Sequence, residues 1–319
     1  EEIGVDLEKL GSIPVLVSYI CQNGCKPSRA ERAHDDPDPM KRDYFRKYDL
    51  GQIEDIALRD IPFWYPKQRM MDCPEDCERW GLLWRPYLRG IERTCDFFTK
   101  RNLWALAALL NAINELDDEQ IRDVMLFAFT GTLLNVSILI QVEKPRRSPN
   151  TYYVPPVGKE IAVWASFESK VETMVRGYRM LNTIGDRKVM ISTSAAQDLS
   201  QIIDDSIDYI FTDPPYGYRV QYGELNFLWE SWLQFSTEWL RDETIINDCR
   251  EKSIVVWGEE LKKAFAECYR VLRPGRAISV CYHDSDPQTW VVFQDLMAET
   301  GFVTEQAHHA LYIGTGQKT

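Results

Sequence analysis

The sequence has 319 residues, of which 45 % are hydrophobic and 12 % aromatic, enough apolar material for one large or two ordinary globular domains. A formal net charge of -12 excludes a protein that coats nucleic acid non-specifically over its whole surface. The longest apolar stretch, 124–142, is interrupted by polar residues, so no membrane partner is expected. The acidic start, 1–9, lacks the pattern of a secretory signal, which predicts a cytoplasmic protein.

Residues 1–95 are predicted to form an irregular, loop-rich module. A short strand is expected over 12–19, and the polar stretch that follows it, through Lys47, has no apolar period. The aromatic segment Pro62-Phe63-Trp64-Tyr65-Pro66 comes next. The module also contains two pairs of cysteines, each with a gap of three residues: Cys21, Cys25, Cys73 and Cys77.

These four cysteines are candidate ligands for one tetrahedral Zn²⁺, which would stabilise a module with little regular structure. The gap within each pair is one residue longer than the commoner spacing, and a long segment, 26–72, separates the pairs. Unligated thiols in two unrelated turns are therefore the alternative. The other cysteines are expected to be small buried hydrophobes: Cys95, Cys249, Cys268 and Cys281.

Residues 96–182 are predicted to be a helical segment. Apolar residues recur at helical spacing over 103–116, 119–141 and 159–182, with Thr99 and Asp117 or Asp118 as caps. A basic, proline-containing loop precedes the third helix and carries Lys144, Arg146 and Arg147. Its charge pattern fits a loop that contacts nucleic-acid phosphates and equally a solvated linker.

Residues 183–319 alternate between strand and helix patterns, which is typical of a parallel α/β sheet. The expected strands are 189–193, 209–212 and 277–282, with a weaker closing pair at 302–305 and 310–313. The expected helices are 224–240, 259–271 and 287–300. The fold class is therefore α/β in this region, with the cysteine module and the helical segment before it.

The sequence Asp213-Pro214-Pro215-Tyr216 follows the apolar strand 209–212 and suits a specific chemistry. An aromatic amine is a poor nucleophile because its lone pair is delocalised into the ring. Asp213 can accept one amine hydrogen and the Pro214 carbonyl the other, which favours a nucleophilic nitrogen. The prolines fix their own φ angles and preorganise both acceptors, and Tyr216 offers a face on which a flipped base can stack. The alternative is that Asp-Pro-Pro forms only a turn after the strand and has no catalytic role.

This tetrapeptide resembles the fourth motif of amino-methyltransferases, in which an acidic first residue is usual for adenine. The neighbouring segments 189–199, 203–208 and 269–276 look like the flanking motifs of the same fold. Over most of the chain, including 98–103, 216–232 and 282–290, the sequence is similar to a prokaryotic family of adenine-specific DNA methylases with a zinc-ribbon-like insertion. Only the Asp-Pro-Pro-Tyr core is chemically diagnostic.

The resemblance implies a Rossmann-like methyltransferase sheet that uses S-adenosylmethionine to methylate the exocyclic amine of adenine in DNA. Asp198 and Asp213 would contact the cofactor, and further subunits of a modification or defence system would be partners. Tyr218, Tyr222 and His283 would contact substrate. The alternatives are core packing for the two tyrosines and a local hydrogen bond for the histidine.

The glycine-rich turn with which such enzymes bind the cofactor is not found in this sequence. Phe129-Thr130-Gly131-Thr132 lies in a helical pattern, and Gly314-Thr315-Gly316 has no helix after it. The resemblance therefore implies that the chain begins after its own cofactor-binding half. The alternative functions are methylation of an RNA base or a protein glutamine, and a DNA-binding subunit without catalysis.

Overall fold

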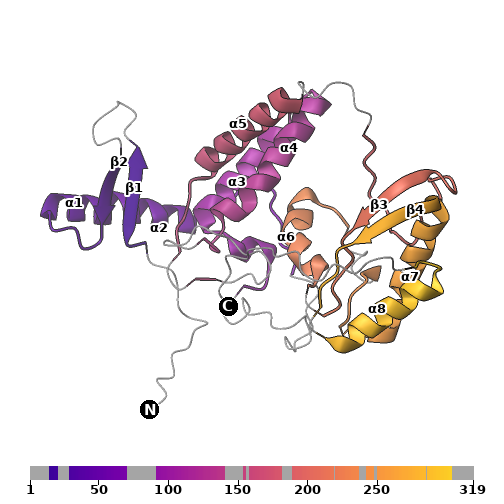
Figure 1. Cartoon of the computed structure of the whole chain (residues 1–319). Helices are drawn as coiled ribbons and strands as arrows, with labels where there is room; N and C mark the ends of the chain where they lie inside the picture. Colours follow the sequence, from indigo (N-terminus) through magenta and orange to yellow (C-terminus); the bar gives the residue numbers. More distant parts are fainter. Residues whose placement is uncertain are drawn as a thin grey trace, which may run out of the picture. The chain divides into compact units, whose positions relative to one another are not determined.

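The computed structural model describes residues 14–20, 29–69, 91–140, 154–155, 158–181, 189–218, 220–236, 242–247, 250–284 and 286–303. The described chain is mixed α/β and mostly helical, with one small parallel sheet (Figure 1). It divides into two compact units. Unit 1 comprises 1–187 and 223–237, and unit 2 comprises 188–222 and 238–319.

Unit 1 begins with an antiparallel hairpin and a helical stretch. Strand β1 (Leu16–Ile20) pairs with β2 (Arg29–Ala33). Helix α1 (Pro39–Tyr44), the π-helical segment η2 (Phe45–Leu50) and α2 (Gly51–Leu58) then follow without a break. The prediction of a loop-rich stretch is wrong for 39–58. Helix formation begins there at a local signal, since the Asp38 side chain accepts from the Met40 amide at 2.9 Å and Pro39 occupies the first helical position.

Three longer helices form the rest of unit 1, and each was predicted from its apolar period. Helix α3 (Lys100–Asn114) is capped by Thr99, and α4 (Glu119–Leu133) by Asp118. Helix α5 (Val163–Leu181) packs beside α4 (Figure 1). The short 3-10 segments η6 (Thr94–Phe97) and η7 (Leu134–Val136) lie before α3 and after α4.

The predicted helix 119–141 is eight residues too long. Helix α4 ends at Leu133, after which the Ser137 hydroxyl donates to the Leu134 carbonyl at 2.9 Å and other groups bond to distant residues. The Asn135 side chain donates to Ser166 Oγ of α5 at 3.0 Å, and the Ile138 amide donates to the Phe97 carbonyl at 2.9 Å. Periodicity alone does not reveal such competition.

The core of unit 1 surrounds Trp232 of helix α6 (Tyr222–Leu233), whose side chain is fully buried. The rings of Trp64, Phe98 and Phe129 meet it edge to face, with centroids 6.4, 5.7 and 5.5 Å away. Such contacts add to the stability gained by burying the apolar area of these rings.

Unit 2 contains the parallel pair β3 (Ile207–Thr212) and β4 (Leu272–Val280). Both were predicted, although β4 begins five residues earlier than expected. Tyr209 is opposite Ala277 and Thr212 is opposite Val280, with an irregularity in the register between Ile207 and Tyr209. Gly275, with φ +75°, lies in that irregular part of β4. It was predicted as a helix C-cap.

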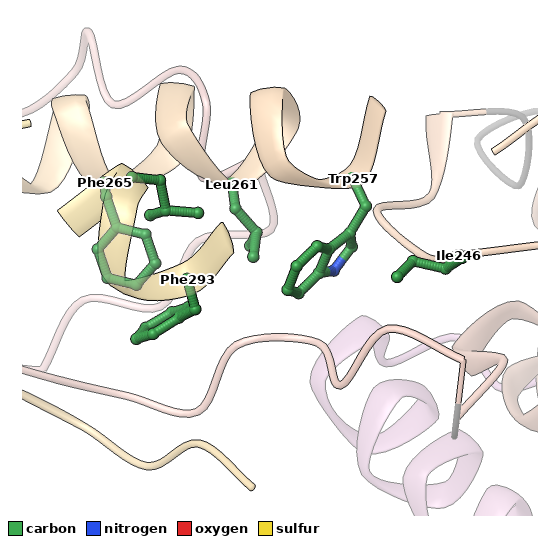
Figure 2. Packing of buried hydrophobic residues seen from close by; sticks show 6 residues of the cluster. Ile246, Trp257, Leu261, Phe265 and Phe293 are labelled. Carbon is green, nitrogen blue, oxygen red and sulfur yellow. The ribbon is translucent and has the colours of Figure 1, made fainter. Parts of the chain in front are cut away.

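Helices α7 (Ile254–Val271) and α8 (Pro287–Glu299) cover one face of this sheet. Figure 2 shows their apolar side chains meeting around Trp257, Leu261 and Phe293. Ile278 and Val280 of β4 pack against the same cluster. On the opposite face, Tyr209 is 55 % and Phe211 67 % exposed.

The predicted strand 189–193 is not a strand in the structure. Val189 and Ile191 are 78 % and 89 % exposed, and a strand is stable only beside a hydrogen-bonded neighbour. Residue Phe302 packs on the α7–α8 cluster, whereas most of the predicted closing pair, 304–305 and 310–313, lies outside the described residues.

Candidate active site

The carboxyl ends of the two parallel strands bring two loops together. Asp213 follows the last residue of β3, and Cys281 follows the last residue of β4. The Cys281 amide donates to the Thr212 carbonyl at 2.9 Å, so the pairing continues to the edge of the sheet. Ligands of α/β folds bind outside this edge. The loops 213–217 and 281–284 therefore form the candidate site.

The Asp213 carboxylate is exposed and fixed in orientation. The Tyr216 hydroxyl donates to Asp213 Oδ1, while the ring of Pro214 between them is buried. Burial and the bond to Asp213 raise the pKa of Tyr216 well above its ordinary value. Tyr216 thus remains a hydrogen-bond donor through the neutral and mildly alkaline range.

Tyr216 also packs on the loop that follows β4. Its ring meets that of Tyr282 edge to face, with centroids 5.9 Å apart. Tyr282 in turn stacks on Phe293 of α8, with ring centroids 4.5 Å apart and planes 8° apart, and meets Trp290 at 4.9 Å. The ring of Tyr216 is therefore supported by the α8 side of the core. Its position is set by packing as well as by the bond to Asp213.

A glycine turn follows the motif. Gly217 has φ +53°, and its carbonyl accepts from the Ile246 amide at 3.2 Å. Farther along, the Asn247 side chain donates to Gln221 Oε1 at 3.1 Å. These two bonds hold Gly217 and Gln221 against the segment 243–247. Together with the bond from the Cys281 amide to the Thr212 carbonyl, they restrain the backbone on both sides of the Asp213–Tyr216 motif.

The structure places Tyr222 beside this motif. Burial raises the pKa of Tyr222, the negative charge of Asp213 raises it further, and a hydrogen bond with the Tyr216 backbone opposes both effects. Tyr218 and His283 are exposed and follow β3 and β4 at the same edge of the sheet. These three predicted substrate residues therefore lie near Asp213 or at the edge that carries it.

Asp198 lies in a turn attached to other parts of unit 2. Its carboxylate accepts from the Ser200 amide at 3.0 Å, and hydrogen bonds from Ser200 lower its pKa. The Leu199 amide donates to Glu267 of α7 at 2.9 Å, and the Gln197 side chain donates to Thr244 Oγ1 at 3.1 Å. The segment 243–247 therefore borders both this turn and the turn at Gly217.

Several predicted residues lie outside the described part of the chain, namely Cys21, Cys25, Cys73, Cys77, Lys144, Arg146 and Arg147. Within the described ranges, no group of three or more His, Cys, Asp or Glu side chains is arranged to hold a metal ion. The described thiols are half-buried at Cys95, Cys268 and Cys281. Burial raises the pKa of Cys95 to about 11.

The predicted site omitted Tyr282, which supports Tyr216. His283 was predicted from the family resemblance of the segment 282–290. The tendency of side chains just after parallel strands to gather at one edge of the sheet would have indicated Tyr282 as well. Its contact with Phe293 was not predictable, because nothing in the spacing of the two residues indicates a stacked pair.

Comparison with protein families, curated proteins and solved structures finds no match to this chain. Among the described residues, no helix combines the length and the apolar character needed to cross a bilayer.

Proposed function

We propose that this chain carries the catalytic site of an S-adenosylmethionine-dependent methyltransferase that modifies the exocyclic amine of adenine in DNA. One observation carries the proposal: an exposed carboxylate, Asp213, lies at the carboxyl end of a parallel strand and is oriented by the hydroxyl of Tyr216. The resemblance of the Asp-Pro-Pro-Tyr sequence to the amino-methyltransferase motif gives this arrangement its expected chemistry.

The proposed role of Asp213 and Pro214 is to hold the amine. Tyr216 occupies Oδ1 of the carboxylate, so the other carboxylate oxygen would accept one amine hydrogen. The Pro214 carbonyl would accept the second. With both hydrogens held, the nitrogen lone pair is directed away from the ring. Because these acceptors are fixed before substrate arrives, little reorganisation is needed during the reaction.

Tyr216 has two proposed roles. Its hydroxyl orients Asp213, and its ring, supported by Tyr282, forms part of the wall beside which an extruded base would lie. A base must leave the duplex to reach such a site, and stacking on an aromatic ring offsets part of that energetic cost. Tyr222 borders the same space.

The described residues provide only part of a cofactor site. S-adenosylmethionine supplies an electrophilic methyl group when bound. Asp198 is the described candidate for contacting it, since its turn borders the segment 243–247 that also holds Gly217. In a methyltransferase sheet, further strands would cover Tyr209 and Phe211, because parallel sheets are normally buried on both faces.

The test is methyl transfer by the full-length natural protein, with isotope-labelled cofactor and genomic DNA that lacks methylated adenine. Asp213→Ala and Asp213→Asn are expected to lower kcat by about 100- to 1,000-fold, as for other preorganised polar groups. Asp208→Asn is the matched control, because Asp208 lies on the same strand and pairs on the surface with Arg273 at 2.7 Å. Full activity of Asp213→Ala would overturn the assignment of this residue.

Competition between duplex DNA, RNA and protein in the same assay identifies the substrate class. Exclusive transfer to RNA or to protein would overturn the DNA proposal while leaving the role of Asp213 intact. Calorimetry with S-adenosylmethionine tests the non-catalytic alternative, which predicts no binding. The two measurements separate a wrong substrate from a wrong activity.

A further inference from the structure

Unit 1 contains a cavity of about 630 Å³ that has no part in the proposed chemistry. Its volume is within the range of pockets that bind small molecules, roughly 300–1,000 Å³. It lies where α2 ends and α3 begins. The residues that line it are Asp60, Ile61, Phe63, Trp64, Tyr65, Lys67, Gln68 and Lys100.

One wall of the cavity is aromatic and held in place. Trp64 is 46 % exposed, yet its ring rests edge-on against the buried Trp232. Pro62 and Pro66 flank the three aromatic residues and restrict the backbone on both sides. The aromatic wall is therefore already formed, and a ligand can stack on it without a rearrangement of the protein.

Hydrogen bonds from a neighbouring segment fix the same wall. Arg93 donates through its guanidinium to the Lys67 carbonyl at 3.0 Å, and the Thr94 amide donates to the Gln68 carbonyl at 3.2 Å. The polar end of the wall is therefore as restrained as the aromatic end.

Two lysines give the cavity a local positive charge in a chain with a net charge of -12. The Lys67 ammonium lies 4.9 Å from the centroid of the Tyr65 ring. Lys100 is the first residue of the 15-residue helix α3, at the end where the helix dipole favours an anion. Asp60 is the one carboxylate of the lining, so the two cations exceed it by one charge.

We propose that this cavity binds a nucleotide, with the base stacked on Trp64 and the phosphate between Lys67 and Lys100. Exposed aromatic faces beside lysines are the combination with which proteins hold unpaired nucleotides, and stacking tolerates any base. Asp60 and Gln68 can accept from polar groups at the edge of a base. The site does not depend on the methyl-transfer proposal, since none of its residues belongs to the Asp213 loop.

The experiment uses the intact chain and measures binding of fluorescein-labelled dT12 by fluorescence anisotropy, with dTMP and inorganic phosphate as competitors. Thymine has no exocyclic amine, so neither thymine probe is a substrate for the Asp213 site. Saturable binding of dT12 is expected. If dTMP binds the intact chain by calorimetry and dT12 does not bind, the ligand is a free nucleotide rather than a strand.

Lys67→Gln with Lys100→Gln is expected to weaken binding about tenfold or more. It should also reduce the slope of log Kd against log salt by about 0.7, the value for one neutralised phosphate on a single strand. Lys159→Gln with Lys263→Gln is the control with the same loss of charge, because both lysines are exposed and neither lines the cavity. Trp64→Leu keeps an apolar contact to Trp232, and should weaken dT12 binding while leaving phosphate binding unchanged.

Three results would overturn the proposal. The first is that neither dT12 nor dTMP binds the intact chain. The second is that the Lys67→Gln, Lys100→Gln variant binds them as tightly as the Lys159→Gln, Lys263→Gln control. The third is that inorganic phosphate displaces dT12 as effectively as dTMP does. The last result would reduce the cavity to an anion site without base recognition. Circular dichroism of each variant shows whether a loss of binding reflects a loss of fold.

Discussion

Substitution of Gly217, the residue after the Asp-Pro-Pro-Tyr motif, is expected to destabilise unit 2 through two separable effects. Its φ of +53° costs an L-residue about 1–2 kcal/mol. A methyl group there would also lie 3.1 Å from Ile246 Cδ1, and Ile246 is a buried member of the core cluster with little room to shift. Overpacking of this kind costs about 1–3 kcal/mol. Gly217→Ala should therefore lose about 2–5 kcal/mol.

Two other glycines of unit 2 separate the contributions. Gly275 has φ +75° but open space around it, so Gly275→Ala should lose only the backbone contribution of about 1–2 kcal/mol. Gly258 lies in helix α7, where a methyl group would approach Val292 Cγ1 to 2.7 Å. Gly258→Ala therefore reports the packing loss less the gain of about 0.5–1 kcal/mol from replacing a helical glycine. The excess loss in Gly217→Ala over Gly275→Ala measures the contact with Ile246.

Hydrogen exchange read by mass spectrometry on peptides from β3 and β4 is the appropriate assay, because it reports the opening of unit 2 separately from unit 1. Faster exchange is expected in the order Gly217→Ala, Gly275→Ala, unmodified chain. If Gly217→Ala exchanged no faster than Gly275→Ala, the packing of the turn against Ile246 would be refuted.

Three further predictions concern other contacts. Tyr216→Phe removes the hydroxyl that donates to Asp213, and should lower kcat about tenfold with little change in KM. The control is Tyr209→Phe, which removes a hydroxyl that donates to Ser279 Oγ. An equal loss of kcat in both variants would contradict the role of Tyr216. Glu267 has its pKa lowered to about 2 by hydrogen bonds from Arg270, so its stabilising effect is present above pH 4.5 and is lost as the pH falls toward 2. The difference in Tm between the unmodified chain and Glu267→Gln should therefore shrink over that interval, and a constant difference would disprove the role of its charge. Trp232→Ala should destabilise unit 1 by about 3–5 kcal/mol in urea unfolding, and a loss below 1 kcal/mol would show that Trp232 is not central to the core.

The sequence predicted the elements whose signal is local. The apolar period and the caps Thr99 and Asp118 located helices α3 and α4, and the apolar run before Asp213 located β3. Where the prediction was wrong, contacts between distant residues decide the structure. After α4, the Ile138 amide bonds to the Phe97 carbonyl instead of to a helical carbonyl, and the absence of a strand at 189–193 depends on a neighbour rather than on its own residues.

The candidate site was predictable to the same extent. The Asp-Pro-Pro-Tyr sequence after a strand indicated both the place and the residues, because the carboxyl end of a parallel strand is where ligands bind. Two contacts that fix the site were not predictable, because each joins residues more than 25 positions apart. The Tyr216 ring contacts the Tyr282 ring, and the Gly217 carbonyl accepts from the Ile246 amide. The cavity around Trp64 was visible only as an aromatic segment between two prolines.

The most direct test of the central claim is to identify the product. Mass spectrometry of nucleosides released from unmethylated genomic DNA, after incubation with the full-length protein and S-adenosylmethionine, should detect adenine methylated on its exocyclic nitrogen. The product should form about 100- to 1,000-fold more slowly with Asp213→Ala and at the normal rate with Asp208→Asn. No methylated nucleoside from a folded protein that binds the cofactor, or the same yield from Asp213→Ala, would contradict the claim that Asp213 holds the reacting amine.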